Sequence, residues 1–211
     1  MVPLLPPLKD NKKIYIICEG SEEYDYLNRL KILNVWSDVY DITLRDAKGN
    51  GNLYPIYQNV YQKGNYDLVV IVCDTEKKPH EQFNDICCKV NSLHACELAS
   101  QHVVMFTNPC TMQVILLHWD TSVRLQTPSK RRSATYIEKY TGIQDYSAKE
   151  SQRTQLVSNI TKESYRTMMN GAKQLGMDAA LINSTNLHLF FAQLEQSDTN
   201  WIDEINKLIE S

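Results

Sequence analysis

The sequence predicts an α/β protein with a mostly parallel sheet, helices on both of its faces, and a helical C-terminal region. The apolar runs at 14–18 and 68–73 contain no alternating polar residues, which is typical of strands buried on both faces. Segments with apolar residues at helical spacing separate these runs. Beyond residue 120 we identify no convincing strand. We therefore expect an α/β core over 1–120 and a mainly helical extension over 121–211 that packs on this core.

Strands and helices alternate along the predicted core. We expect strands at 14–18, 39–44, 68–73 and 102–106, and helices with apolar faces at 26–33, 53–60 and 83–93. In the extension, Ser147 to Glu150 have the pattern of a capping box that opens a helix, and further helical faces lie at 187–194 and 202–209. Sheets whose strands alternate with helices along the chain bind ligands at the carboxyl ends of their strands. Residues that directly follow a strand are therefore the first candidates for a functional site.

The composition favours a globular protein of the cytoplasm. The chain has 211 residues, 43% of them hydrophobic, and its 22 basic and 25 acidic residues give a net charge of 22 − 25 = −3. The 6 cysteines have no paired spacing and fit a reducing compartment. Residues 1–8 form an apolar leader interrupted by prolines, unlike a signal peptide. Because the run at 68–73 is far shorter than the ~20 residues that cross a bilayer, we expect no membrane segment.

Acidic residues follow two of the predicted strands. Glu19 comes directly after the first strand and Asp74 after the third, with Glu76 close behind it. If these strands are parallel neighbours, the carboxylates meet at one edge of the sheet and can bind Mg²⁺ or Mn²⁺ beside phosphate oxygens. Such an ion activates a water and stabilises the leaving oxygen of a phosphodiester. Glu23, about one helical turn beyond Glu19, is a candidate outer ligand or general base, although an acid there also suits the start of a helix.

Basic residues are concentrated in one region of the extension. From Arg124 to Lys173 the chain has ten basic and four acidic residues, a local charge of 10 − 4 = +6. Lys130, Arg131 and Arg132 are the candidates for binding the phosphate backbone of DNA or RNA. A solvated helical surface explains the same charges, so both interpretations stay open at this point.

Cysteine and histidine chemistry has weaker support. Cys110 and His118 could form a nucleophile and its base only if the fold brings them together. A zinc site would have to use residues that lack paired Cys-x-x-Cys spacing, namely Cys87, Cys88, His94 and Cys96. We therefore expect neither thiol catalysis nor a zinc site.

Four sequence blocks resemble a known family. The string from Ile17 to Tyr24, Ile-Cys-Glu-Gly-Ser-Glu-Glu-Tyr, is similar to the opening of Toprim domains in overcoming-lysogenization-defect nucleases and in the RloB and AbiLii families. The other blocks are the loop 49–51 before a helix, the pair 107–110 and 115–119, and the string 183–188. The blocks occur in the family's order across nearly the whole chain, so the chain resembles the RloB-like family.

This resemblance implies a fold and an activity. It implies a Toprim fold in which Glu19 is the acid after the first strand, and Asp74 and Glu76 are the acidic pair after the third. It also implies a Mg²⁺-dependent nuclease with a role in bacterial anti-phage defence or abortive infection, commonly beside an ATPase partner encoded nearby. Two positions depart from the family pattern: Glu76 replaces the usual second Asp, and Met112 stands where an acid is usual.

We therefore expect a metal-dependent Toprim nuclease that hydrolyses phosphodiester bonds in nucleic acid. The first alternative is a non-catalytic, Toprim-derived subunit that binds an ATPase sensor; Met112 and the net charge of −3 favour it. The second alternative is a metal-dependent enzyme that acts on free nucleotides, because phosphate chemistry looks alike at this level. The sequence leaves a homo-oligomer open.

Overall fold

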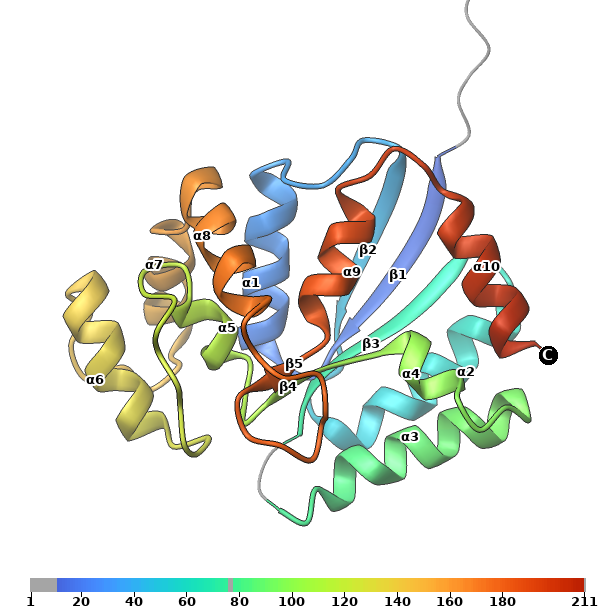
Figure 1. The fold of residues 1–211 in the computed structure, drawn as a ribbon, viewed down its shortest axis with the longest axis horizontal. Helices are drawn as coiled ribbons and strands as arrows, with labels where there is room; N and C mark the ends of the chain where they lie inside the picture. Colours follow the sequence, from blue (N-terminus) through green and yellow to red (C-terminus); the bar gives the residue numbers. More distant parts are fainter. Residues whose placement is uncertain (1–10, 76–77, 211) are drawn as a thin grey trace, which may run out of the picture.

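The computed structural model describes residues 11–75 and 78–210 (Figure 1). The predicted apolar leader at 1–8 and Glu76 lie outside these described residues. Among the helices that are described, none has both the length and the apolar character that a membrane span requires.

Within the described residues, five strands form one sheet in the order β2-β1-β3-β4-β5. The first four are parallel, and β5 pairs antiparallel with β4. Side chains of the central strand β3 are buried from Leu68 to Cys73, as expected for a strand covered on both faces. The predicted α/β class with a mostly parallel sheet is confirmed. The strands are β1 Lys12–Cys18, β2 Tyr40–Asp46, β3 Leu68–Asp74, β4 Val104–Asn108 and β5 Ser184–Thr185.

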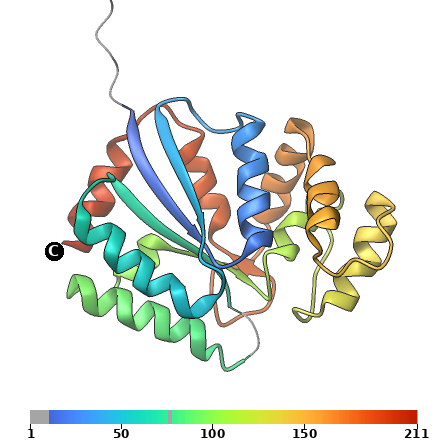
Figure 2. The ribbon, with the colours of Figure 1, turned by 180° about the vertical axis from the view of Figure 1, so that it is seen from behind.

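Helices cover both faces of this sheet (Figures 1 and 2). The chain moves from β1 to β2 in one direction and from β2 to β3 in the other, so right-handed crossovers place α1 on one face and α2 and α3 on the opposite face. A short 3-10 turn, η1 Asn50–Asn52, lies in the predicted loop before α2. The helices of this part are α1 Ser21–Ile32, α2 Leu53–Lys63, α3 Glu81–His94 and α4 Ala99–Val103.

The C-terminal region packs on the sheet and on α1. Its helices are α5 Met112–Leu116, α6 Lys130–Thr141, α7 Glu150–Ser158, α8 Lys162–Ala172, α9 Leu187–Leu194 and α10 Asn200–Ile209. α9 lies on the face of α1, where the rings of Trp36 and Phe191 are 5.7 Å apart. At α10, the indole nitrogen of Trp201 donates to the hydroxyl of Tyr40 at 2.8 Å. These contacts join the extension to the core, and a domain boundary at residue 120 stays a prediction.

The structure corrects three local predictions. β5 is a strand beyond residue 120, held by Asn186, whose side-chain oxygen accepts from Phe106 N at 2.7 Å. The strand predicted at 102–106 begins at Val104, because residues 102–103 belong to α4. The predicted capping box is wrong: α7 begins at Glu150, and Ala148 has a left-handed φ of 61°, so the turn before the helix does not place Ser147 at the cap.

Candidate active site

The topology brings two of the predicted acids to one place. Because β2 and β3 lie on opposite sides of β1, the sheet has its switch point between the carboxyl ends of β1 and β3, where α/β sheets bind ligands. Glu19 directly follows β1, and Asp74 is the last residue of β3. The prediction that parallel neighbouring strands bring these residues together is confirmed by the β1–β3 pairing.

Hydrogen bonds fix the orientation of both side chains. The backbone N–H of Asp74 donates to Oε2 of Glu19 at 2.9 Å. Oδ1 of Asp74 accepts two bonds from Thr111, one from the backbone N–H at 2.7 Å and one from the hydroxyl at 2.8 Å. Thr111 lies in the turn between β4 and α5, so three neighbouring strands position this pair of acids.

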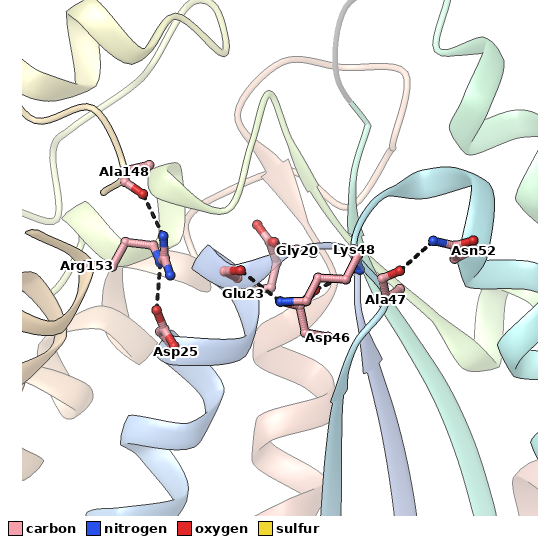
Figure 3. A network of polar contacts seen from close by, with 10 residues as sticks. Gly20, Glu23, Asp25, Asp46, Ala47, Lys48, Asn52, Ala148 and Arg153 are labelled. Carbon is pink, nitrogen blue, oxygen red and sulfur yellow. Dashed lines mark hydrogen bonds and ion pairs between the residues drawn. The ribbon is translucent and has the colours of Figure 1, made fainter. Parts of the chain in front are cut away.

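Glu23 completes the acidic cluster from the first turn of α1. Its Oε2 accepts a hydrogen bond from the backbone N–H of Gly20 at 3.0 Å, which satisfies an N–H group at the helix start (Figure 3). The side chain is buried, with 6% of the residue exposed. Glu23 is therefore both a capping residue and a wall of the site, as the sequence allowed.

Glu19, Glu23 and Asp74 line the same cavity, so their negative charges lie close together. This cavity has a volume of about 610 Å³, and Glu19, Glu23, Asp74, Thr111 and Met112 lie in its lining. Burial, together with the charges of Glu23 and Glu19, raises the pKa of Asp74 well above its usual range. Burial also raises the pKa of Glu23. The site therefore favours the binding of a proton or a cation.

The C-terminal extension supplies the opposite wall of this cavity. Arg153 on α7 is the basic residue in the lining; its Nε donates to Asp25 at 2.7 Å and its Nη1 to the carbonyl of Ala148 at 2.6 Å (Figure 3). The hydroxyl of Tyr146, also in the lining, donates to Glu22 at 2.9 Å. The bonds to Asp25 and Glu22 tie the extension to α1, so the cavity lies between the sheet edge and the extension.

A third strand-end acid has a different environment. Asp46 ends β2 and accepts a hydrogen bond from the amine of Lys48 at 2.6 Å (Figure 3). It also accepts one from the hydroxyl of Ser21 at 2.8 Å. Burial by itself would raise the pKa of Asp46, but these bonds outweigh it and the pKa is lowered. Asp46 is thus a neutralised structural acid, in contrast to Asp74.

The cluster fits a divalent cation in the chemistry of its donors. Carboxylate oxygens are the ligands of Mg²⁺ and Mn²⁺, and a cation would offset both the burial and the repulsion from Glu23 and Glu19 that raise the pKa of Asp74. In the part of the chain that the structure describes, no group of three or more His, Cys, Asp or Glu side chains is arranged to hold a metal ion. Of the three predicted ligands, Glu19 and Asp74 belong to the described part of the structure, and Glu76 lies outside that part.

The predicted nucleic-acid residues do not line this cavity. Arg131 and Arg132 are exposed in the first turn of α6, whereas the next residue, Ser133, is part of the lining. The side chain of Lys130 lies outside the described part of the structure. A role of these residues in binding a phosphate backbone stays a prediction.

The cysteine and histidine considered from sequence are not paired. Cys110 lines the cavity, but burial and the charge of Asp74 raise the pKa of its thiol, which disfavours the reactive thiolate. Both ring nitrogens of His118 form hydrogen bonds, Nε2 with the hydroxyl of Tyr26 at 3.1 Å and Nδ1 with the hydroxyl of Ser164 at 2.9 Å. Burial lowers the pKa of His118 to about 3. His118 is therefore a neutral packing residue.

Sequence reasoning missed three residues of the site: Thr111, Tyr146 and Arg153. Thr111 directly follows the block 107–110, so its position beside a strand end was a usable signal. Arg153 belongs to the basic region that the sequence identified, but no spacing rule separates it from the other basic residues. Tyr146 reaches the cavity from a loop with no recognisable pattern.

Comparisons with known proteins agree with the sequence blocks. The RloB-like protein family matches residues 14–211. Among solved structures, the C-terminal region of the Burkholderia pseudomallei OLD protein is similar, with a TM-score of 0.47 and 12% identity over 75% of this chain and 95% of that chain. No curated protein matches the chain. Because the family match spans almost the full sequence, the chain belongs to the RloB-like family.

Proposed function

We propose that this protein is a Toprim-type, metal-dependent nuclease that hydrolyses phosphodiester bonds in nucleic acid and serves bacterial anti-phage defence. The observation that carries the proposal is the cavity at the switch point, where Glu19, Glu23 and Asp74 face a wall that contains Arg153. Acids that would hold a cation and a guanidinium that would bind a phosphate are the two kinds of group that phosphoryl transfer requires. The family supports the defence role.

The residues of the chain divide this work between them. Glu19 and Asp74 would hold Mg²⁺ or Mn²⁺, which, when bound, lowers the pKa of a water and neutralises phosphate charge. Thr111 keeps Asp74 in one orientation through its two hydrogen bonds. Glu23, whose pKa burial raises, is suited to accept a proton from the attacking water. Arg153, held by Asp25 and Ala148, is preorganised to bind a phosphate oxygen.

The test is a cleavage assay with the purified chain. We would incubate it with plasmid, single-stranded DNA, total RNA and tRNA, each with Mg²⁺, Mn²⁺ or EDTA, beside Glu19→Gln and the control Glu204→Gln, an exposed acid on α10. We expect metal-dependent cleavage that Glu19→Gln abolishes and Glu204→Gln retains, with neither variant melting below the parent. Cleavage by Glu19→Gln at the parental rate would overturn the site assignment.

One observation favours a second function, that of a non-catalytic subunit bound to an ATPase sensor. Met112 places an apolar side chain in the cavity at the position where family members usually have an acid. The two functions differ in what the purified chain does. No cleavage and no metal binding by calorimetry, together with co-purification with a neighbouring ATPase, would favour the subunit and refute the nuclease.

A further inference from the structure

A second hollow lies along α8, outside the carboxylate cavity. Its volume is about 450 Å³, and it has no lining residue in common with that cavity. One stripe of α8 forms its long side, from Lys162 to Lys173, which corresponds to about 16 Å at 1.5 Å per residue. The loop after α1 and the end of α9 close it with Asn34, Val35 and Glu195. We call this hollow the α8 groove.

The α8 groove has an apolar floor and a cationic rim. Tyr165 and Met169 are buried, whereas Lys162, Arg166 and Lys173 are exposed around them. These basic residues and the single acid Glu195 give the lining a charge of 3 − 1 = +2, although the whole chain has a net charge of −3. The groove is therefore a local concentration of positive charge on an acidic protein.

The three cations of the groove are not held in salt bridges, although the charge of Glu163 on α8 acts on Lys162 and Arg166. None of the salt bridges in the described part of the chain includes Lys162, Arg166 or Lys173. The acid that lines the groove, Glu195, accepts a hydrogen bond from the hydroxyl of Tyr165 at 2.6 Å. The amines and the guanidinium therefore keep their donors available for an anion.

Helix stability does not explain the charge of Lys162, whereas Lys173 is at the C-terminal end of α8, where the helix dipole favours a cation. Lys162 is the first residue of α8, where the helix dipole disfavours a cation. The first turn is stabilised instead by the hydroxyl of Thr161, which accepts from Ser164 N at 3.2 Å. A residue that opposes the dipole at a capped helix start has another reason to be basic, and an anionic ligand is consistent with its place on the rim.

We propose that the α8 groove binds the phosphate backbone of a polynucleotide, so that the substrate of the carboxylate site is a nucleic-acid strand rather than a free nucleotide. Phosphates repeat along a strand and match a row of cations about 16 Å long, whereas a mononucleotide in the carboxylate cavity has no phosphate left for the groove. Asn34 and Asn170 add amide donors on the same rim. The substrate statement rests on the function proposed above.

The experiment measures binding in EDTA, so that cleavage does not interfere. We would titrate labelled single-stranded DNA and RNA of about 20 nucleotides, monitored by fluorescence anisotropy, at several salt concentrations. The variant is Arg166→Glu with Lys173→Glu. The matched control is Lys63→Glu with Lys207→Glu, which makes the same charge change at exposed residues of α2 and α10. Circular dichroism would check that both variants are folded.

We expect the groove variant to bind at least about tenfold more weakly. The slope of log K for binding against log salt concentration should become less steep by about 1.4, the value for two phosphate contacts on a single strand. The control should bind like the parent. Equal affinity of parent and groove variant, equal losses in both variants, or equally tight binding of polyglutamate by the parent would each overturn the proposal.

The experiments distinguish a wrong groove proposal from a wrong nuclease proposal. Cleavage by the groove variant at the parental rate and affinity, lost only in Glu19→Gln, would refute the groove and keep the nuclease. Binding that depends on Arg166 and Lys173 in a chain that cuts nothing would refute the nuclease and keep the groove as a binding site.

Discussion

Replacement of Asp74 by Asn should stabilise the metal-free protein, although it should abolish activity. The amide oxygen can still accept both hydrogen bonds from Thr111, so the substitution removes the charge and keeps the geometry. The folded-state pKa of Asp74 is raised above its ordinary value of 3.8, so the folded protein binds more protons than the unfolded chain between the two values. Stability therefore falls as pH rises through this window.

The expected result at pH 7.5 in EDTA is a gain in the free energy of unfolding, because the substitution removes a charge that burial and the charges of Glu23 and Glu19 disfavour. For a chain of this length, each kcal/mol gained corresponds to an increase in melting temperature of about 2–4 °C, which a thermal melt detects. The gain should shrink as pH falls toward the ordinary pKa of 3.8, because Asp74 of the parent then takes up its proton in the folded state. Excess Mg²⁺ should raise the melting temperature of the parent and not that of Asp74→Asn, because only the parent keeps the charge that binds it.

Asp46→Asn is the control, for which we expect the opposite change in melting temperature. The pKa of Asp46 is lowered by its hydrogen bonds with Lys48 and Ser21, so its charge contributes stability above its ordinary pKa of 3.8, and this contribution is lost as pH falls. Asp46→Asn should therefore melt below the parent at pH 7.5. If Asp74→Asn also melts below the parent in EDTA, the repulsion among Glu19, Glu23 and Asp74 is not what governs this site.

Three further outcomes are expected. Arg153→Met should raise KM for nucleic acid at least about tenfold while Arg153→Lys keeps part of the affinity, because the guanidinium lines the cavity; unchanged steady-state kinetics in the Met variant would contradict this. Tyr146→Phe should lower the free energy of unfolding by about 1 kcal/mol in a urea titration, because the bond to Glu22 is lost; no change would mean that this bond does not hold the extension. Burial lowers the pKa of His118 from 6.5 to about 3, so the parent should lose stability as pH falls below about 6.5, and His118→Gln should lose less over that range; identical pH profiles of melting temperature would contradict the assignment.

The strands and most helices of the core could be predicted from the sequence because their signals are local. The run 68–73 is apolar throughout, and it forms the buried strand β3 with Asp74 at its end. The positions of Glu19 and Asp74 at strand ends followed from the same runs. Parallel pairing of strands separated by helices then brings both acids to one edge, without any information on side-chain contacts.

Only the tertiary structure decided what surrounds those acids. β5 has two residues, too few for any periodicity, and it exists because Asn186 and Thr185 bond to β4 from about 80 positions away in the chain. Arg153 and Tyr146 reach the cavity because their bonds to α1 span more than 120 positions. A pattern within a window of the sequence reports which faces are apolar, whereas these contacts depend on how the whole extension packs. The same packing, and not the basic composition, distinguishes the α8 groove from the exposed arginines of α6.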